Sequence, residues 1–209
     1  MFYMQYILAP LMFVSAVLGA PAAELETRQS CSSLQLVHIA GTTEIGLGIV
    51  GTPLAVALAS AVPGTTTKSI TYDTIAEYVV TVAAGAAITT TYLSAQAARC
   101  PNQRFVLSGY SKGALVVHSM TLSSSLKSKI AAILVFGDPA RNINQPWPIN
   151  NPSVDLSPKD GSSSSQNIAS FCNFSDLFCY PLGVSLPAHL AYPTDGSIRV
   201  AANFVKDRV

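Results

Sequence analysis

Gly109-Tyr110-Ser111-Lys112-Gly113 lies between the apolar run 105–107 and the apolar segment 114–117. This order predicts a buried strand, a sharp turn and a helix. The flanking glycines let the chain turn tightly enough to present the hydroxyl of the central serine, and the new helix offers unpaired N–H groups to a developing oxyanion. The G-x-S-x-G pattern is therefore typical of a nucleophilic serine. It also fits a serine in an ordinary strand-to-helix turn, so further residues are needed to distinguish the two.

The flanking sequence predicts strands and helices in alternation. Apolar runs bounded by turn residues predict strands at 34–40, 69–72, 104–108, 131–136 and 167–171. Apolar and alanine-rich segments predict helices at 52–62, 80–99, 114–122 and 197–208. The alternation predicts the α/β class, with a central parallel sheet flanked by helices. Residues 138–166 are rich in proline, asparagine and serine, which predicts a long surface loop with little regular structure.

Length and composition exclude several classes of protein. The 209 residues suit a single domain, and 49% of them are hydrophobic, enough to form a core. Only 11% of the residues are charged and the formal net charge is +1, so the chain has no field that would attract nucleic acid or anionic lipid. We therefore expect no nucleic-acid partner.

Residues 1–22 predict a secretory signal peptide. The segment is almost wholly apolar and ends in Ala20-Pro21-Ala22, a small-x-small pattern that signal peptidase accepts. Residues 23–30 are predicted to be a short pro-segment or a disordered N-terminus, and residues 31–209 the mature domain. No Lys or Arg precedes Arg28, so an uncleaved apolar anchor is the alternative. Once the signal is removed, we expect a secreted, extracellular protein without stable membrane insertion.

Four cysteines follow the predicted signal: Cys31, Cys100, Cys172 and Cys179. An even number in a secreted chain predicts two disulfides, for which three pairings exist. Cys172 and Cys179 enclose a loop short enough to close locally, which leaves Cys31 to pair with Cys100. A zinc site does not fit, because no C-x-x-C occurs and the three histidines are scattered. We expect no metal and no cofactor.

A nucleophilic serine needs a general base, and the chain has only three histidines. His38 lies in the first predicted strand, where a role in the core or at the surface fits better. His118 lies on the same predicted helix as Ser111, about two turns along, too far to reach back to the hydroxyl. His189 comes after the last predicted strand, which agrees with the order serine, acid, histidine of α/β-hydrolases. We predict His189 as the base.

The orienting acid should lie between the serine and the histidine, where four aspartates stand: Asp138, Asp155, Asp160 and Asp176. Asp176 lies inside the cysteine-bounded loop 172–179, and a disulfide would stiffen that loop and hold the carboxylate against the imidazole. We predict Asp176 as the acid. Asp138 is the reserve candidate, and Asp155 and Asp160 are expected to be solvated in the polar loop.

These features resemble the cutinase family of serine esterases, which includes acetylxylan esterases. The resemblance covers most of the mature chain and rests on four stretches: 109–113, 172–179, Ala188-His189-Leu190-Ala191-Tyr192 and Ala40-Gly41-Thr42-Thr43-Glu44. It implies a small, cutinase-like α/β-hydrolase without a large lid. It also implies that the backbone N–H groups of Thr42 and Lys112 form the oxyanion hole, with the Thr42 hydroxyl assisting.

Two residues depart from the family pattern. Lys112 occupies a position that is glutamine in many members, and Ala40 occupies one that is often arginine. The oxyanion contact at residue 112 is a backbone N–H, so lysine keeps that role, while its charge is expected to alter substrate preference or pH response. The missing arginine removes an anchor of the oxyanion loop.

The resemblance implies hydrolysis of a cutin-type polyester or of other acyl esters through an acyl-enzyme on Ser111. Because the histidine base must be neutral, we expect activity to fall below about pH 6 to 7.

Apolar residues near His189 suit either an acyl chain or core packing: Leu182, Val184, Leu186, Pro187 and Leu190. We expect a monomer that acts on a polymer surface or an acylated polysaccharide. Removal of acetyl groups from plant polysaccharide is the alternative activity, and a non-catalytic secreted cell-wall or surface binding module is the alternative of another class.

Three further motifs have a second interpretation. Gly46-x-Gly48-x-x-Gly51 matches a dinucleotide fingerprint and Asp73 follows it, but the glycines begin too far beyond the first strand and Glu44 would face a pyrophosphate, so NAD is not expected. Asn173-Phe174-Ser175 is a glycosylation sequon whose occupancy the sequence leaves open. Trp147 either touches a polymer surface or anchors its loop, and anchoring fits better.

Overall fold

The computed structural model describes residues 31–209; the predicted signal peptide and the segment 23–30 lie outside the described residues. Six strands form one sheet in the order β2-β1-β3-β4-β6-β5, and every neighbouring pair is parallel. Their bounds are Leu34–Ile39 (β1), Thr66–Ser69 (β2), Arg104–Tyr110 (β3), Ile130–Phe136 (β4), Val154–Asp155 (β5) and Ile168–Phe171 (β6). The apolar run of β4 is buried along its whole length, as expected of a strand covered on both faces.

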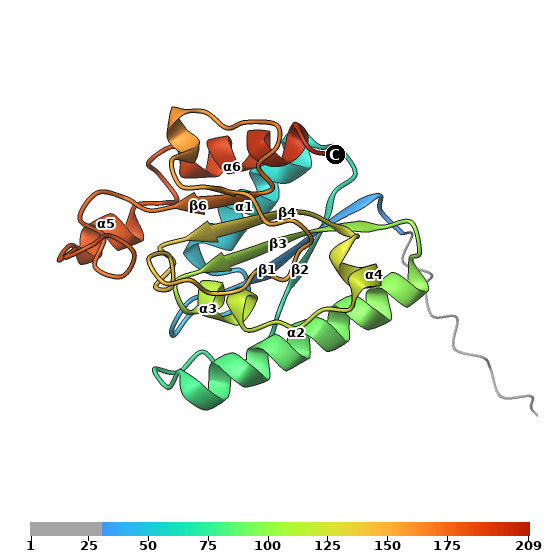
Figure 1. Cartoon of the computed structure of the whole chain (residues 1–209), viewed down its shortest axis with the longest axis horizontal. Helices are drawn as coiled ribbons and strands as arrows, with labels where there is room; N and C mark the ends of the chain where they lie inside the picture. The colour runs from blue at the N-terminus through green and yellow to red at the C-terminus, as the bar shows by residue number, and fades with distance from the viewer. Residues whose placement is uncertain (1–30) are drawn as a thin grey trace, which may run out of the picture. The chain divides into compact units, whose positions relative to one another are not determined.

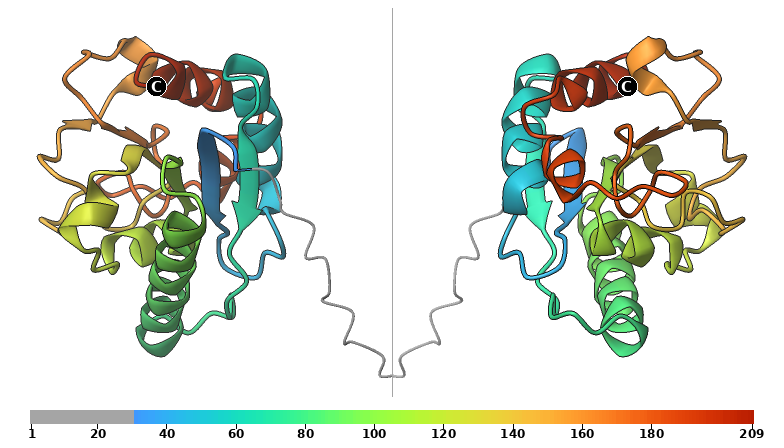
Figure 2. Two further views of the ribbon diagram at one scale, coloured as in Figure 1. Left: turned by 90° about the vertical axis from the view of Figure 1, so that its right-hand side faces the viewer. Right: turned by 90° about the vertical axis from the view of Figure 1, so that its left-hand side faces the viewer.

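Helices cover both faces of the sheet (Figures 1 and 2). One layer consists of α1 (Gly48–Ala61) and α6 (Ser197–Lys206), and the other of α2 (Val79–Arg99), α3 (Lys112–His118) and α4 (Ser124–Lys127). Each layer buries its own apolar cluster against the sheet. The predicted α/β class, with a central parallel sheet flanked by helices, is confirmed.

Some elements differ from the prediction. The strand expected at 69–72 lies at Thr66–Ser69. It is a polar strand at the edge of the sheet, and the apolar Ile70, which is buried, comes just after its end and not within it. The helix expected at 52–62 begins already at Gly48, and the one expected at 114–122 ends at His118. The predicted loop 138–166 contains the short β5 and a 3₁₀ turn. The five-residue α5 (Leu186–Leu190) was not predicted, since it is too short to show a helical period.

The strand order brings two loops together at one edge of the sheet. The chain passes from β1 to the edge strand β2 and returns across β1 to β3, so the direction of the winding reverses between β1 and β3. Loops after such neighbouring strands separate and leave a crevice at the carboxyl ends, where α/β proteins bind ligands. Thr42 follows β1 and Ser111 follows β3. In Figure 1, α5, which carries His189, lies off the same ends of the strands.

Both predicted disulfides are present. Cys31 and Cys100 join the start of the described chain to the end of α2, with their Cα atoms 5.6 Å apart. Cys172 and Cys179 close the loop after β6, with their Cα atoms 5.8 Å apart. Within residues 31–209, no helix combines the length and the apolar character needed to cross a bilayer.

His38 is fully buried between the sheet and α1. Its Nδ1 shares a hydrogen bond of 3.0 Å with Ser108 Oγ on the neighbouring strand β3. Gly51 of α1 lies so close that a Cβ atom there would be 2.2 Å from His38 Cδ2. Burial lowers the pKa of His38 to about 3, so the imidazole is neutral in the folded protein over the ordinary pH range.

We expect His38 to make the free energy of unfolding depend on pH. Between pH 6.5 and about 3 the unfolded state binds a proton at His38 that the folded state does not bind, so stability falls as the pH falls through this window. The loss is roughly 3 kcal/mol between pH 6.5 and 4. The variant His38→Asn keeps a hydrogen-bonding group for Ser108 and should lose this dependence. Urea unfolding of both proteins at pH 7 and pH 4 measures the difference, and equal losses would contradict the prediction.

Candidate active site

Ser111 lies at the sharp turn between β3 and α3, with φ of 52° and ψ of −116°. A positive φ is uncommon for a residue with a side chain and marks a strained turn. The flanking glycines are required by close backbone approach: a Cβ on Gly113 would lie 2.0 Å from the Ile39 carbonyl oxygen, and one on Gly109 would lie 2.4 Å from the Gly113 carbonyl oxygen. The turn therefore has the strained strand-to-helix form that the sequence predicted.

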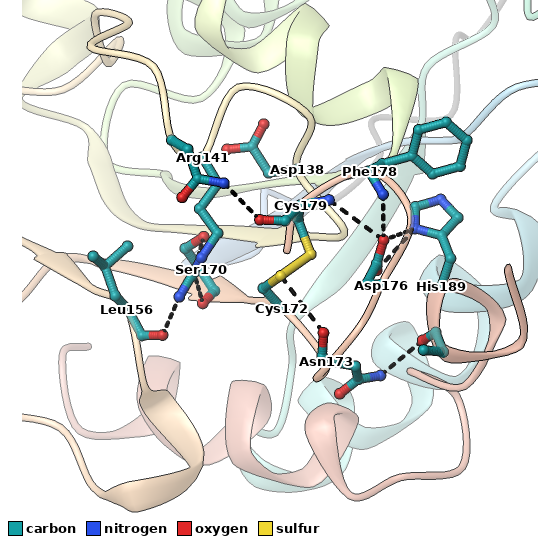
Figure 3. The surroundings of a disulfide bond; sticks show 12 residues. Asp138, Arg141, Leu156, Ser170, Cys172, Asn173, Asp176, Phe178, Cys179 and His189 are labelled. Carbon is teal, nitrogen blue, oxygen red and sulfur yellow. Dashed lines mark hydrogen bonds and ion pairs between the residues drawn. A yellow bond between two sulfur atoms is a disulfide. The ribbon is translucent and has the colours of Figure 1, made fainter. Parts of the chain in front are cut away.

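Asp176 and His189 are hydrogen-bonded to each other. His189 Nδ1 lies 3.0 and 2.9 Å from the two carboxylate oxygens of Asp176 (Figure 3). The buried carboxylate also accepts the Phe178 N–H at 2.8 Å and the Tyr192 hydroxyl. Burial alone would raise the pKa of Asp176, but these hydrogen bonds outweigh it and the pKa is lowered. Asp176 is thus an ionised acid that fixes the orientation of the imidazole.

The disulfide loop holds Asp176 beside α5. Figure 3 shows the bridge between Cys172 and Cys179 next to the contact of Asp176 with His189. Asn173 in the same loop donates from Nδ2 to the Ala188 carbonyl at 2.9 Å, which ties the loop to the residue before the histidine. This asparagine is the one in the sequon, and its glycosylation stays a prediction.

His189 is packed beside the serine turn. Its ring stacks on that of Tyr110, the residue before Ser111, with centroids 5.0 Å apart, and the Tyr110 hydroxyl donates to the His189 carbonyl at 2.9 Å. The Phe178 ring is tilted against the His189 ring, with centroids 4.5 Å apart. Within residues 31–209 no hydrogen bond joins Ser111 Oγ to His189. Such bonds are often long without substrate and shorten when substrate binds.

A second pair of histidine and aspartate consists of His118, the last residue of α3, and Asp138, which follows β4. His118 Nε2 is 2.9 Å from Asp138 Oδ2, and its Nδ1 is 3.0 Å from the Pro146 carbonyl oxygen. The reserve candidate Asp138 is therefore engaged by another histidine, which also packs against Trp147 with ring centroids 3.9 Å apart. Trp147 anchors its loop, as the sequence favoured.

Of the remaining aspartates, Asp160 is exposed, as predicted. The prediction that Asp155 is solvated was wrong. Asp155 is buried, and its carboxylate accepts the Ser157 N–H at 2.9 Å and the Ser162 hydroxyl. A sequence rich in polar residues did not show that this carboxylate turns inward to organise its own loop.

The loop after β1 is held from two directions. Glu44 accepts the Gly41 N–H at 2.6 Å and the Ile49 N–H of α1 at 2.8 Å. From the other side, the Thr43 N–H donates to the Thr74 carbonyl at 2.7 Å. The Glu44 carboxylate therefore occupies the start of α1, where the glycines of a dinucleotide fingerprint would receive a pyrophosphate.

Exposed apolar side chains surround the candidate site. The residues noted near His189 are exposed and do not form core: Leu182, Val184, Leu186, Pro187 and Leu190. Leu182 and Val184 are 99% and 81% exposed. A second group consists of Ile45 after β1, Ile75 before α2 and Val79, the first residue of α2. Apolar side chains that are open to solvent at a site suit an apolar ligand or surface.

The chain is similar in sequence and in fold to known proteins. A family model described as Cutinase matches residues 30–209. The chain is 31% identical over 214 residues to a cutinase of Botryotinia fuckeliana, which covers 97% of this chain and 95% of that protein. It is 30% identical over 191 residues to cutinase CUT1 of Coprinopsis cinerea, which covers 86% and 87%. A solved acetylxylan esterase has a similar fold, with a TM-score of 0.70 at 24% identity over 86% of this chain and 99% of that one.

Proposed function

The chain belongs to the cutinase family and is a carboxylic ester hydrolase, and on that premise we propose that Ser111, His189 and Asp176 form its catalytic triad. The observation that carries the proposal is the hydrogen-bonded pair of Asp176 and His189 packed against the strained turn of Ser111. A histidine oriented by a buried carboxylate is the arrangement that activates a serine hydroxyl.

The proposed reaction is acyl transfer in two steps. His189 Nε2 takes the proton of Ser111 Oγ as the oxygen attacks the ester carbonyl carbon, and the same proton then goes to the leaving alcohol. The backbone N–H groups of Thr42 and Lys112 stabilise the oxyanion. A water molecule, deprotonated by His189, attacks the acyl-enzyme carbonyl, and the acid is released as His189 returns the proton to Ser111 Oγ. Asp176 stays ionised and stabilises the imidazolium, in keeping with its lowered pKa.

We propose that the substrate has an acyl chain longer than acetyl and belongs to a cutin-type polyester or a similar apolar ester. The exposed apolar residues around the site support this, because an acetyl group on a hydrated polysaccharide does not need them. Deacetylation of plant polysaccharide is the second candidate, supported by the similarity in fold to the acetylxylan esterase. The protein is proposed to act outside the cell as a monomer, and its two disulfides suit an oxidising compartment.

Esters of increasing acyl length test the function and the preference together. We expect p-nitrophenyl butyrate to be hydrolysed with a kcat/KM about 10-fold above that of the acetate, since each of its two added methylenes contributes about 0.8 kcal/mol when buried, and the hexanoate with a still higher one. Val184→Ser should reduce this preference several-fold, while Val56→Ser, a 70% exposed valine on α1, should leave it unchanged. A preference for acetate would favour the deacetylase, and the absence of hydrolysis of any ester would refute the esterase.

A further inference from the structure

The side chain of Lys112 is fully buried beside the candidate site, where lysine is rare without partners. Its ammonium group donates to the carbonyls of Asp73 at 3.0 Å and Ile75 at 2.6 Å. It also lies 5.5 and 5.4 Å from the ring centroids of Tyr72 and Tyr78, within the range of cation–π attraction. In the described chain it forms no ion pair with a carboxylate. Backbone carbonyls and aromatic rings stabilise this cation, together with the more distant charges of Asp73 and Glu77.

The same two tyrosines hold the loop that follows β1. The Tyr72 hydroxyl donates to the Ala40 carbonyl at 2.7 Å. The Tyr78 hydroxyl shares a hydrogen bond of 2.9 Å with Thr42 Oγ1. The side chain of Ala40 is only a methyl group and gives this loop no polar anchor of its own. Hydrogen bonds therefore join the loop that carries Thr42, one proposed oxyanion donor, to the segment 72–78 around the Lys112 ammonium group.

We propose that the Lys112 side chain is a positioning group for the oxyanion hole. Its ammonium group holds the segment 72–78 in place, and this segment holds Thr42. The backbone N–H of Lys112 is the other proposed donor, so one residue supplies one donor and sets the position of the second. Oxyanion donors stabilise the transition state only when they are held in place before the reaction. The inference rests on the proposed function and deepens it.

The variant Lys112→Met tests the proposal, because it keeps the backbone N–H and an apolar stem but removes the ammonium group. We expect kcat for p-nitrophenyl butyrate to fall roughly 10- to 30-fold with KM within about twofold of the wild-type value, because the lost stabilisation belongs to the transition state. This is less than the roughly 10²- to 10³-fold loss on removing a donor outright. Lys68→Met is the matched control. Lys68 is in β2, and its ammonium group lies 5.2 Å from the centroid of the Tyr92 ring, so the loss of this ammonium group should leave kcat unchanged.

A second variant, Tyr78→Phe, keeps the ring beside the ammonium group but removes the hydroxyl that contacts Thr42. We expect kcat to fall roughly 3- to 10-fold, again with KM little changed. The double variant should be no slower than Lys112→Met within about twofold, because both changes release the same loop. Titration of active serine with an organophosphate normalises each kcat to the folded fraction.

Two results would overturn the inference: a kcat of Lys112→Met within twofold of wild type, or losses that multiply in the double variant. If Lys112→Met does not fold, the Tyr78→Phe variant decides, and an unchanged kcat there overturns the proposal. A wild-type protein that neither hydrolyses esters nor reacts with the organophosphate would refute the proposed function instead. The two failures are therefore distinguishable.

Discussion

Replacement of Ser111 by alanine is expected to lower kcat for ester hydrolysis by about 10⁴- to 10⁶-fold, because no other group can form the acyl-enzyme. The free energy of unfolding should change by less than about 1 kcal/mol, since Ser111 Oγ makes no hydrogen bond within residues 31–209. Steady-state kinetics and urea unfolding measure the two quantities. Retention of more than about 1% of the activity would exclude Ser111 as the nucleophile.

Ser119→Ala is the matched control for this variant. Ser119 follows α3 only eight positions after Ser111, is exposed, and donates from Oγ to the Leu115 carbonyl at 2.9 Å. Its loss should leave kcat within about twofold of wild type. Mass spectrometry after treatment with an organophosphate adds an independent measurement: wild type and Ser119→Ala should carry one adduct on Ser111, and Ser111→Ala none. A non-catalytic binding module would carry no adduct even in the wild type.

Asp176→Asn is expected to lower kcat by about 10³- to 10⁴-fold. The amide is close to the carboxylate in shape, but it can present its NH₂ group to His189 Nδ1 and so favour the wrong tautomer of the imidazole, and it carries no charge to stabilise the imidazolium. The variant should affect the reaction of Ser111 with its ester only by making His189 a weaker base. The pH dependence of kcat/KM and the rate of organophosphate labelling both report it.

Asp138→Asn provides a control of the same chemistry at the other pair. Asp138 is also buried and lies 2.9 Å from a histidine, His118, but that histidine packs against Trp147 and not against the serine turn. We expect the variant to lower the stability by about 1 to 3 kcal/mol and to leave kcat per titrated active site within about threefold. A larger loss of kcat in Asp138→Asn than in Asp176→Asn would assign the acid to the reserve candidate.

The strand-turn-helix unit around Ser111 could be predicted from the sequence because its signals are local. Glycines on both sides of one residue, an apolar run before it and a helical segment after it specify the conformation of about a dozen consecutive residues. Spacing likewise favoured the pairing of Cys172 with Cys179, and the structure contains this bridge. The place of Asp176 within that loop made it the preferred acid, and the structure puts it in contact with His189.

The burial of polar side chains could not be predicted from such short stretches of sequence. His38 faces α1 only because β1 is covered on that side. Asp155 and the exposed Asp160 lie five residues apart in the same polar segment, yet Asp155 is buried. The apolar residues Leu182 and Val184 suited a core and a surface equally well, and both are exposed. Burial depends on which segments pack together, and distant parts of the chain decide that.

The sequence by itself determined the α/β class, the serine turn and the two disulfides, and it supplied the residues proposed for the triad, since each of these rests on periodicity, spacing or a short motif. Only the tertiary structure decided that His118 takes Asp138 as its partner, and that the Lys112 ammonium lies on the carbonyls of Asp73 and Ile75. These contacts join residues 20 to 39 positions apart. They form because the winding order of a parallel sheet gathers the loops after successive strands at one edge, whatever their separation along the chain.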